Sequence, residues 1–129
     1  MGFLQKLFGG STEPKDTKTL PWISLINTDQ LHDIEMRSKT KPQVIFKYST
    51  RCGINRVVMN RFVEDYGYSG EAFDLYYLDI IGYREISNAI AHRFNVLHES
   101  PQVLVIKNGT VVAQASHGAI SGLDLKAFV

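Results

Sequence analysis

The chain has 129 residues, of which 44% are hydrophobic, and this size and composition fit one globular domain. Its 14 Lys and Arg residues nearly balance its 13 Asp and Glu residues, and the formal net charge of +1 argues against a basic surface that binds nucleic acid. No apolar stretch approaches the roughly 20 residues that span a bilayer, so we expect no membrane partner.

Residues 1–20 form the first predicted unit, a short N-terminal segment followed by a linker. Residues 9–20 are small and polar and contain proline, which is typical of a linker. The apolar core of residues 1–10 is too short for a secretory signal. The single cysteine, Cys52, has no second cysteine for an intramolecular disulfide, which favours a reducing, cytoplasmic compartment. Residues 21–129 are expected to fold as one domain.

From residue 22 onward, the apolar residues switch repeatedly between strand spacing and helix spacing. Asn27, followed three residues later by Gln30, predicts the start of the first helix, because side chains at this spacing can cap each other's backbone. In chain order, the elements predicted in the first half are a strand at 22–26, a helix at 27–39, a strand at 44–48 and a helix at 54–66.

The second half of the chain predicts a hairpin and a closing helix. Asn108-Gly109 stands between two apolar runs, and Asn-Gly is the strongest short hairpin signal. Ser121 and Asp124 are placed to cap the closing helix. The elements predicted here are a strand at 73–80, a helix at 84–94, strands at 102–106 and 110–115, and a helix that runs through 129.

The resulting order is β-α-β-α-β-α-β-β-α. Parallel strands need crossover connections, so we expect the first three strands to form a parallel core and the terminal hairpin to add an antiparallel pair. The predicted fold is therefore α/β, with a central mixed sheet and helices on both faces. This arrangement resembles that of thioredoxin.

Cys52 is the main candidate for chemistry, because it lies between the second predicted strand and the second predicted helix. A thiol at the first turn of a helix meets the positive end of the helix dipole and unpaired backbone N–H groups. Both favour the thiolate, which is the nucleophilic form. The sequence therefore predicts a reactive cysteine at this junction.

Three segments carry a resemblance to a known family: residues 46–55 (FKYSTRCGIN), 98–102 (HESPQ) and 116–121 (SHGAIS). They are similar to the monothiol bacilliredoxins, thioredoxin-fold proteins of the bacillithiol system. The resemblance covers about residues 22–129. It implies a thiol-disulfide oxidoreductase that removes bacillithiol, or a similar low-molecular-weight thiol, from S-thiolated client proteins. It implies no bound cofactor, since the small thiol is a co-substrate.

Within this resemblance, residues 52–55 (Cys-Gly-Ile-Asn) occupy the place of the Cys-x-x-Cys turn. Ser100-Pro101 stands where thioredoxin-like proteins keep a cis-proline. The family commonly has Cys-Pro-Ile-Ser, so Gly53 and Asn55 are departures. Asn55 cannot resolve a mixed disulfide, and the resolving thiol must therefore come from outside the chain.

The predicted site gathers residues from three parts of the chain. The topology should bring Ser100, Pro101 and His117 near Cys52, where His117 is either an active group, as a cation or proton shuttle, or a surface histidine. Asn55 is expected either to hydrogen-bond the thiolate or a bound thiol's carboxylates, or to face water. The remaining candidates for substrate contact follow the second strand and open the helix: Tyr48, Thr50, Arg51, Gly53 and Ile54.

Several alternatives stay open from the sequence. Tyr48 is as well suited to covering the edge of the core as to substrate contact, and His98 is a weaker candidate for the site than His117. A non-catalytic thioredoxin-fold peptide-binding module would use the Pro101 groove without the thiol. A glutaredoxin-like iron–sulfur carrier would hold a cluster across a dimer with external thiols. The four histidines and one cysteine show no metal-ligand spacing, so no metal site is predicted.

Overall fold

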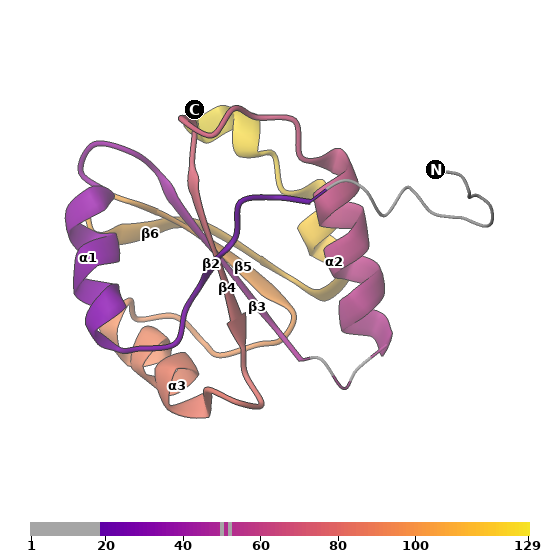
Figure 1. Cartoon of the computed structure of the whole chain (residues 1–129), viewed down its shortest axis with the longest axis horizontal. Helices are drawn as coiled ribbons and strands as arrows, with labels where there is room; N and C mark the ends of the chain where they lie inside the picture. The colour runs from indigo at the N-terminus through magenta and orange to yellow at the C-terminus, as the bar shows by residue number, and fades with distance from the viewer. Residues whose placement is uncertain (1–18, 50, 52) are drawn as a thin grey trace, which may run out of the picture.

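A five-stranded mixed sheet forms the centre of the computed structural model, which describes residues 19–49, 51 and 53–129 (Figure 1). The elements in chain order are β2 (Ile23–Ser24), α1 (Asp29–Arg37), β3 (Gln43–Tyr48), α2 (Gly53–Asp65), β4 (Asp74–Asp79), α3 (Arg84–Arg93), β5 (Gln102–Lys107), β6 (Thr110–Ser116) and two 3-10 helices, η2 (His117–Gly122) and η3 (Leu125–Phe128). The predicted linker within residues 1–20 lies almost wholly outside the described residues.

The strand order is β2-β4-β3-β5-β6, with β2, β4 and β3 parallel to one another. Strand β5 runs antiparallel to β3, and β6 runs antiparallel to β5. The predicted parallel core and antiparallel hairpin are therefore confirmed. Because β5 is antiparallel to β3, the start of β5 lies beside the end of β3, and Lys47 pairs in register with Gln102.

Helices cover both faces of the sheet, as predicted. Figure 1 shows α1 and α3 on one side of the sheet and α2 on the other. Successive residues of a strand point to opposite faces, so Ile45 packs with the α1 and α3 residues while Val44 and Phe46 pack with α2. The central strand β3 is thus buried on both faces, and this packing fixes the position of its last residue, Tyr48, where the candidate site begins.

Two local predictions are confirmed, one by hydrogen bonds and the other by backbone dihedral angles. At the start of α1, Asn27 Oδ1 accepts from the backbone N–H of Asp29 (2.7 Å), and Gln30 Oε1 accepts from the backbone N–H of Asn27 (3.0 Å). At the hairpin, Asn108 and Gly109 both have positive φ, 52° and 78°, as a two-residue type I′ turn requires.

The predicted closing helix is wrong, because the chain ends in two short 3-10 helices. Asp124 does cap the second one, accepting from Lys126 N (3.1 Å), but Ser121 Oγ donates to Gly118 O instead of capping a helix. Ile120 and Leu125 are both buried against the α2 face of the sheet. In one continuous α-helix, two residues five apart would point about 140° away from each other. Burying both therefore requires the break between η2 and η3.

The first strand is shorter than predicted, with two residues in place of five. Trp22, predicted as its first residue, lies outside the strand and packs its ring against Phe46 and Phe62, at centroid distances of 6.2 and 6.0 Å. Within the described residues, the structure has no helix long and apolar enough to cross a membrane.

Candidate functional site

The candidate site lies where β3 ends at Tyr48 and α2 begins at Gly53. Cys52 and Thr50 fall outside the described residues, so their predicted roles stay predictions. In the sequence, Cys52 directly precedes the first residue of α2. The geometry of the site is therefore built from the described residues that surround this junction.

Asn55 connects three parts of the site. Its side chain is buried, with 3% of the residue exposed, and its Oδ1 accepts from the backbone N–H of Ser49 (2.6 Å) and from Ser100 Oγ (3.1 Å). Ser49 follows β3, Asn55 lies in the first turn of α2, and Ser100 lies just before β5. Of the two alternatives for Asn55, the one in which its side chain only faces water is wrong, because the residue is buried and its amide oxygen accepts two hydrogen bonds.

The Ser100–Pro101 peptide bond is cis, as the resemblance to thioredoxin-like proteins implied. Pro101 is buried, and its carbonyl oxygen accepts from the backbone N–H of His117 (3.0 Å). Ser100 in turn contacts Asn55, so the structure brings Asn55, Ser100, Pro101 and His117 together. Ser100, Pro101 and His117 thus lie beside one another, while the predicted closeness of these three residues to Cys52 stays a prediction.

His117 is an exposed side chain at the end of β6, with 59% of its surface accessible. Its φ of 54° lies in the left-handed region, which residues other than glycine seldom adopt. Its Nδ1 lies 3.5 Å from Glu99 Oε1, and this contact becomes an ion pair when the imidazole is protonated. Glu99 was not among the predicted site residues, although it stands two positions before Pro101 in the sequence.

Tyr48 packs at the edge of the core. Its ring lies 5.5 Å from that of Tyr77 and 6.3 Å from that of Phe46. Burial, together with the neighbouring Tyr77 and the Asp79 carboxylate, raises the pKa of the Tyr48 phenol. Tyr48 also lines a cavity of about 220 Å³ with Ser49, Arg56 and Met59, so the core contact does not remove it from the surface of the site.

The first two turns of α2 present apolar side chains to solvent. Ile54 is 62% exposed and Val57 is 66% exposed, whereas large hydrophobic residues are usually buried. Gly53 and Arg51 are exposed beside them. Neither Arg51 nor Arg56 forms an ion pair with a carboxylate of the described residues. This end of α2 therefore combines an apolar surface with two cations.

Comparison with protein families shows which family the chain belongs to. A family model described as monothiol bacilliredoxin BrxC matches residues 23–125. The chain belongs to the monothiol bacilliredoxin family. Membership places it among thiol-disulfide oxidoreductases of the bacilliredoxin type, in agreement with the resemblance found in the sequence.

Solved structures confirm the thioredoxin-like fold of this bacilliredoxin. A proposed oxidoreductase with a thioredoxin fold is 31% identical with a TM-score of 0.65, over 77% of this chain and 85% of that one. Thioredoxin from Schistosoma mansoni is 22% identical with a TM-score of 0.62, over 84% and 95% of the two chains. Thioredoxin from Malassezia sympodialis is 18% identical with a TM-score of 0.64, over 81% and 88%.

Sequence reasoning missed a buried polar cluster beneath the site of the bacilliredoxin. Lys47 is fully buried, and its Nζ donates to Gln102 Oε1 (3.0 Å). Burial lowers the pKa of Lys47 to about 8, and the Glu99 carboxylate opposes this shift. The available signal was positional: Lys47 and Gln102 stand at inward-facing positions of two mostly apolar strands, and a buried polar residue needs a polar partner.

His98 lies beside this cluster, although the residue itself is exposed. Its Nδ1 lies 2.8 Å from Ser87 Oγ on α3. Burial lowers the pKa of His98, and the positive charges of Lys47 and Arg84 lower it further, against the opposite effect of Glu99. A histidine kept neutral in this way serves as a hydrogen-bonded anchor of the loop before β5.

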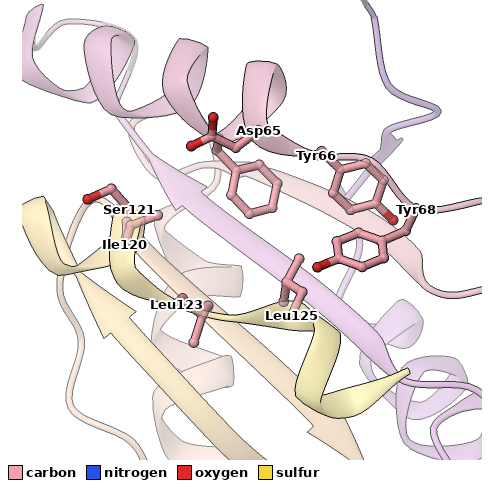
Figure 2. Close-up of a pocket in the computed structure, with 8 residues that line it drawn as sticks. Asp65, Tyr66, Tyr68, Ile120, Ser121, Leu123 and Leu125 are labelled. Atoms are coloured by element: carbon pink, nitrogen blue, oxygen red, sulfur yellow. The ribbon is translucent and has the colours of Figure 1, made fainter.

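A shallow groove runs along the other side of α2, between this helix and the two 3-10 helices. Figure 2 shows its far end, a cavity of about 60 Å³ in which Tyr66 and Tyr68 face Ile120, Leu123 and Leu125. A second cavity of about 140 Å³ continues toward His117, and the two share Phe62, Ile120 and Ser121. The part of the bacilliredoxin that the structure describes contains no group of three or more His, Cys, Asp or Glu side chains that could hold a metal ion.

Proposed function

We propose that this bacilliredoxin removes bacillithiol, or a similar low-molecular-weight thiol, from mixed disulfides on the cysteines of client proteins, with Cys52 as the nucleophile. The observation that carries the proposal is the state of Asn55. A dithiol enzyme would have its resolving cysteine at this position, but here a buried amide spans Ser49 and Ser100. The chain therefore lacks an internal resolving thiol, and the second thiol must be a separate molecule.

The proposed reaction has two exchange steps. The Cys52 thiolate attacks the small-thiol sulfur of the client's mixed disulfide. The disulfide bond between this sulfur and the client's cysteine sulfur breaks, and the client cysteine leaves as a thiolate that takes up a proton. Cys52 now carries the small thiol. A second small-thiol thiolate attacks the small-thiol sulfur of this mixed disulfide, which releases Cys52 as thiolate and a symmetric small-thiol disulfide. Both steps conserve electrons, so no further oxidant or reductant is needed.

A low pKa of Cys52 would serve the second step more than the first. Lowering the pKa from about 8.5 to about 6 raises the thiolate fraction at neutral pH about thirtyfold. With a Brønsted coefficient of about 0.4 to 0.5, the intrinsic nucleophilicity falls roughly tenfold, so attack gains only a few fold. Departure gains more, because thiolates of low pKa leave faster. This balance suits a carrier that accepts a small thiol and gives it up again.

The residues around the junction of β3 and α2 include candidate contacts for the client protein and for the small thiol. The exposed Ile54 and Val57 provide an apolar contact for a client, and Ser100 and Pro101 provide an edge for its extended backbone. The cavity lined by Arg56 suits the carboxylates of an acidic small thiol. His117, held beside Glu99, is the candidate for proton transfer to the departing thiolate.

We assign the activity to residues 21–129, with residues 1–20 as an appended segment, and to the cytoplasm, where a lone thiol stays reduced. The test uses a peptide whose cysteine is disulfide-linked to bacillithiol. Mass spectrometry should show the bacillithiol adduct moving from the peptide to Cys52, and a Cys52→Ser variant should accept none. No adduct on Cys52, or release of bacillithiol from the peptide at the same rate by Cys52→Ser, would overturn the proposal.

A further inference from the structure

The buried Lys47 plays no part in the two exchange steps, although burying an ammonium group is costly. Its residue is completely buried at the end of β3, and no described carboxylate lies within ion-pair distance of its Nζ. A buried ammonium with one hydrogen bond loses most of its hydration. A methionine of similar length would occupy the same space without this cost.

The partner of Lys47 explains what the ammonium is placed to do. Gln102 Oε1 accepts from Lys47 Nζ (3.0 Å) and from the backbone N–H of Glu99 (3.4 Å). Gln102 Nε2 donates to Leu97 O (3.0 Å) and to Gln114 Oε1 (2.7 Å). The Gln102 amide is thus saturated, and two of its four contacts fix the backbone of the segment from Leu97 to Glu99.

This segment leads directly into the substrate edge of the site. Ser100 follows it and donates to Asn55 Oδ1 (3.1 Å), and Pro101 accepts from the backbone of His117 (3.0 Å). Glu99 lies within the segment and faces His117 at 3.5 Å. A rotation of the Gln102 amide would therefore move Glu99 and Ser100 together.

We propose that Lys47 is a positioning residue for thiol–disulfide exchange, acting through Gln102 to hold residues 97–100 against the first turn of α2. The inference rests on the proposed function, because it concerns the client edge of the same site. Lys47 Nζ is the nearer of the two donors to Gln102 Oε1 (3.0 Å, against 3.4 Å for the Glu99 N–H), and it favours the orientation in which Nε2 donates to Leu97 O. Without the Lys47 donor, only the longer contact from the Glu99 N–H holds Gln102 Oε1, and the amide fixes the backbone of residues 97–99 less firmly.

The experiment compares two reactions of the full chain. Alkylation of Cys52 by iodoacetamide needs only the thiolate, whereas exchange with a peptide mixed disulfide also needs the client edge in register. In Lys47→Met, we expect the alkylation rate at pH 7 to stay within twofold of the wild-type rate, the exchange rate to fall about tenfold, and the unfolding temperature not to decrease. Lys41→Met, which removes the same charge at the opposite end of β3, should change neither rate by more than twofold.

A second variant protects the test against a folding defect. Gln102→Glu keeps an acceptor for Lys47 but cannot donate to Leu97 O, so it should show the same selective loss of exchange. Exchange within twofold of wild type in the folded variants overturns the inference, and so does an equal slowing of alkylation and exchange. If the wild-type protein itself exchanges no small thiol, the proposed function fails, which the alkylation control distinguishes from a failure of the positioning role.

Discussion

Replacing Asn55 with alanine tests whether its amide holds the site together. The substitution removes the acceptor of the Ser49 N–H and of the Ser100 hydroxyl. A buried donor left without a partner costs about 1 to 3 kcal/mol. Ser49 and Ser100 are only partly buried, so water can reach them and the lower end of that range applies to each. The free energy of unfolding should therefore fall by about 2 to 3 kcal/mol.

Urea denaturation followed by circular dichroism, with Cys52 kept reduced, measures this difference. For a chain of this size, the loss corresponds to a decrease in the urea midpoint of about 1 to 2 M. Asn60→Ala is the matched control, because Asn60 lies on the same helix but is exposed, and its substitution should change the stability by less than about 0.5 kcal/mol. If Asn55→Ala and Asn60→Ala unfold at the same urea concentration, the hydrogen bonds of Asn55 to Ser49 and Ser100 do not stabilise the fold.

Three further predictions concern other features of the chain. The pKa of Lys47 is lowered to about 8 in the folded protein. Between about pH 8 and 10.5 the unfolded state therefore binds one more proton than the folded state, and the free energy of unfolding should rise with pH across this window, by at most about 3 kcal/mol. This rise should be absent when the pH profile of unfolding is measured for Lys47→Met. Arg56→Gln should slow exchange with the dianionic thiol mercaptosuccinate about two- to fivefold without changing the rate with neutral 2-mercaptoethanol. In the control variant Arg61→Gln, the replaced arginine already pairs with Asp65, and neither rate should change. An equal loss of rate with both thiols in Arg56→Gln would contradict an anion-binding role for Arg56. Gly109→Ala should lower the free energy of unfolding by about 1 to 2 kcal/mol, because φ is 78° at this residue, and an unchanged thermal midpoint would show that the turn tolerates the strain.

The order of the elements could be predicted because each one carries its own local signal. The Asn27 and Gln30 cap and the Asn108-Gly109 turn depend on residues within four positions of each other, and both formed as expected. The closing helix failed for the opposite reason. Ile120 and Leu125 are both buried against the α2 face of the sheet, and this contact between distant elements overrode the local capping signal of the predicted helix.

The candidate site shows the same division. The neighbourhood of Ser100, Pro101 and His117 follows from strand direction alone, so topology was enough to predict it. The buried state of Asn55 was not predictable, because its partners stand 6 and 45 positions away in the sequence. Lys47 was overlooked because a polar residue in a mostly apolar strand does not by itself indicate which side chain of the neighbouring strand will accept its hydrogen bond.

The loop before β5 is held from both faces of the sheet, and this arrangement explains why the chain can lack a second cysteine without a loose site. On the α2 face, Asn55 binds Ser100, and on the α3 face, Gln102 binds the backbone of Leu97 and Glu99. A cysteine at position 55 could resolve a disulfide, but its sulfur is a weak acceptor and would not hold two donors. Asn55 cannot resolve a disulfide, but its amide oxygen accepts two hydrogen bonds that hold the neighbouring segments in place. In the proposed reaction, the client edge would therefore be held by hydrogen bonds before a substrate arrives, and the catalytic cycle would depend on a thiol from another molecule.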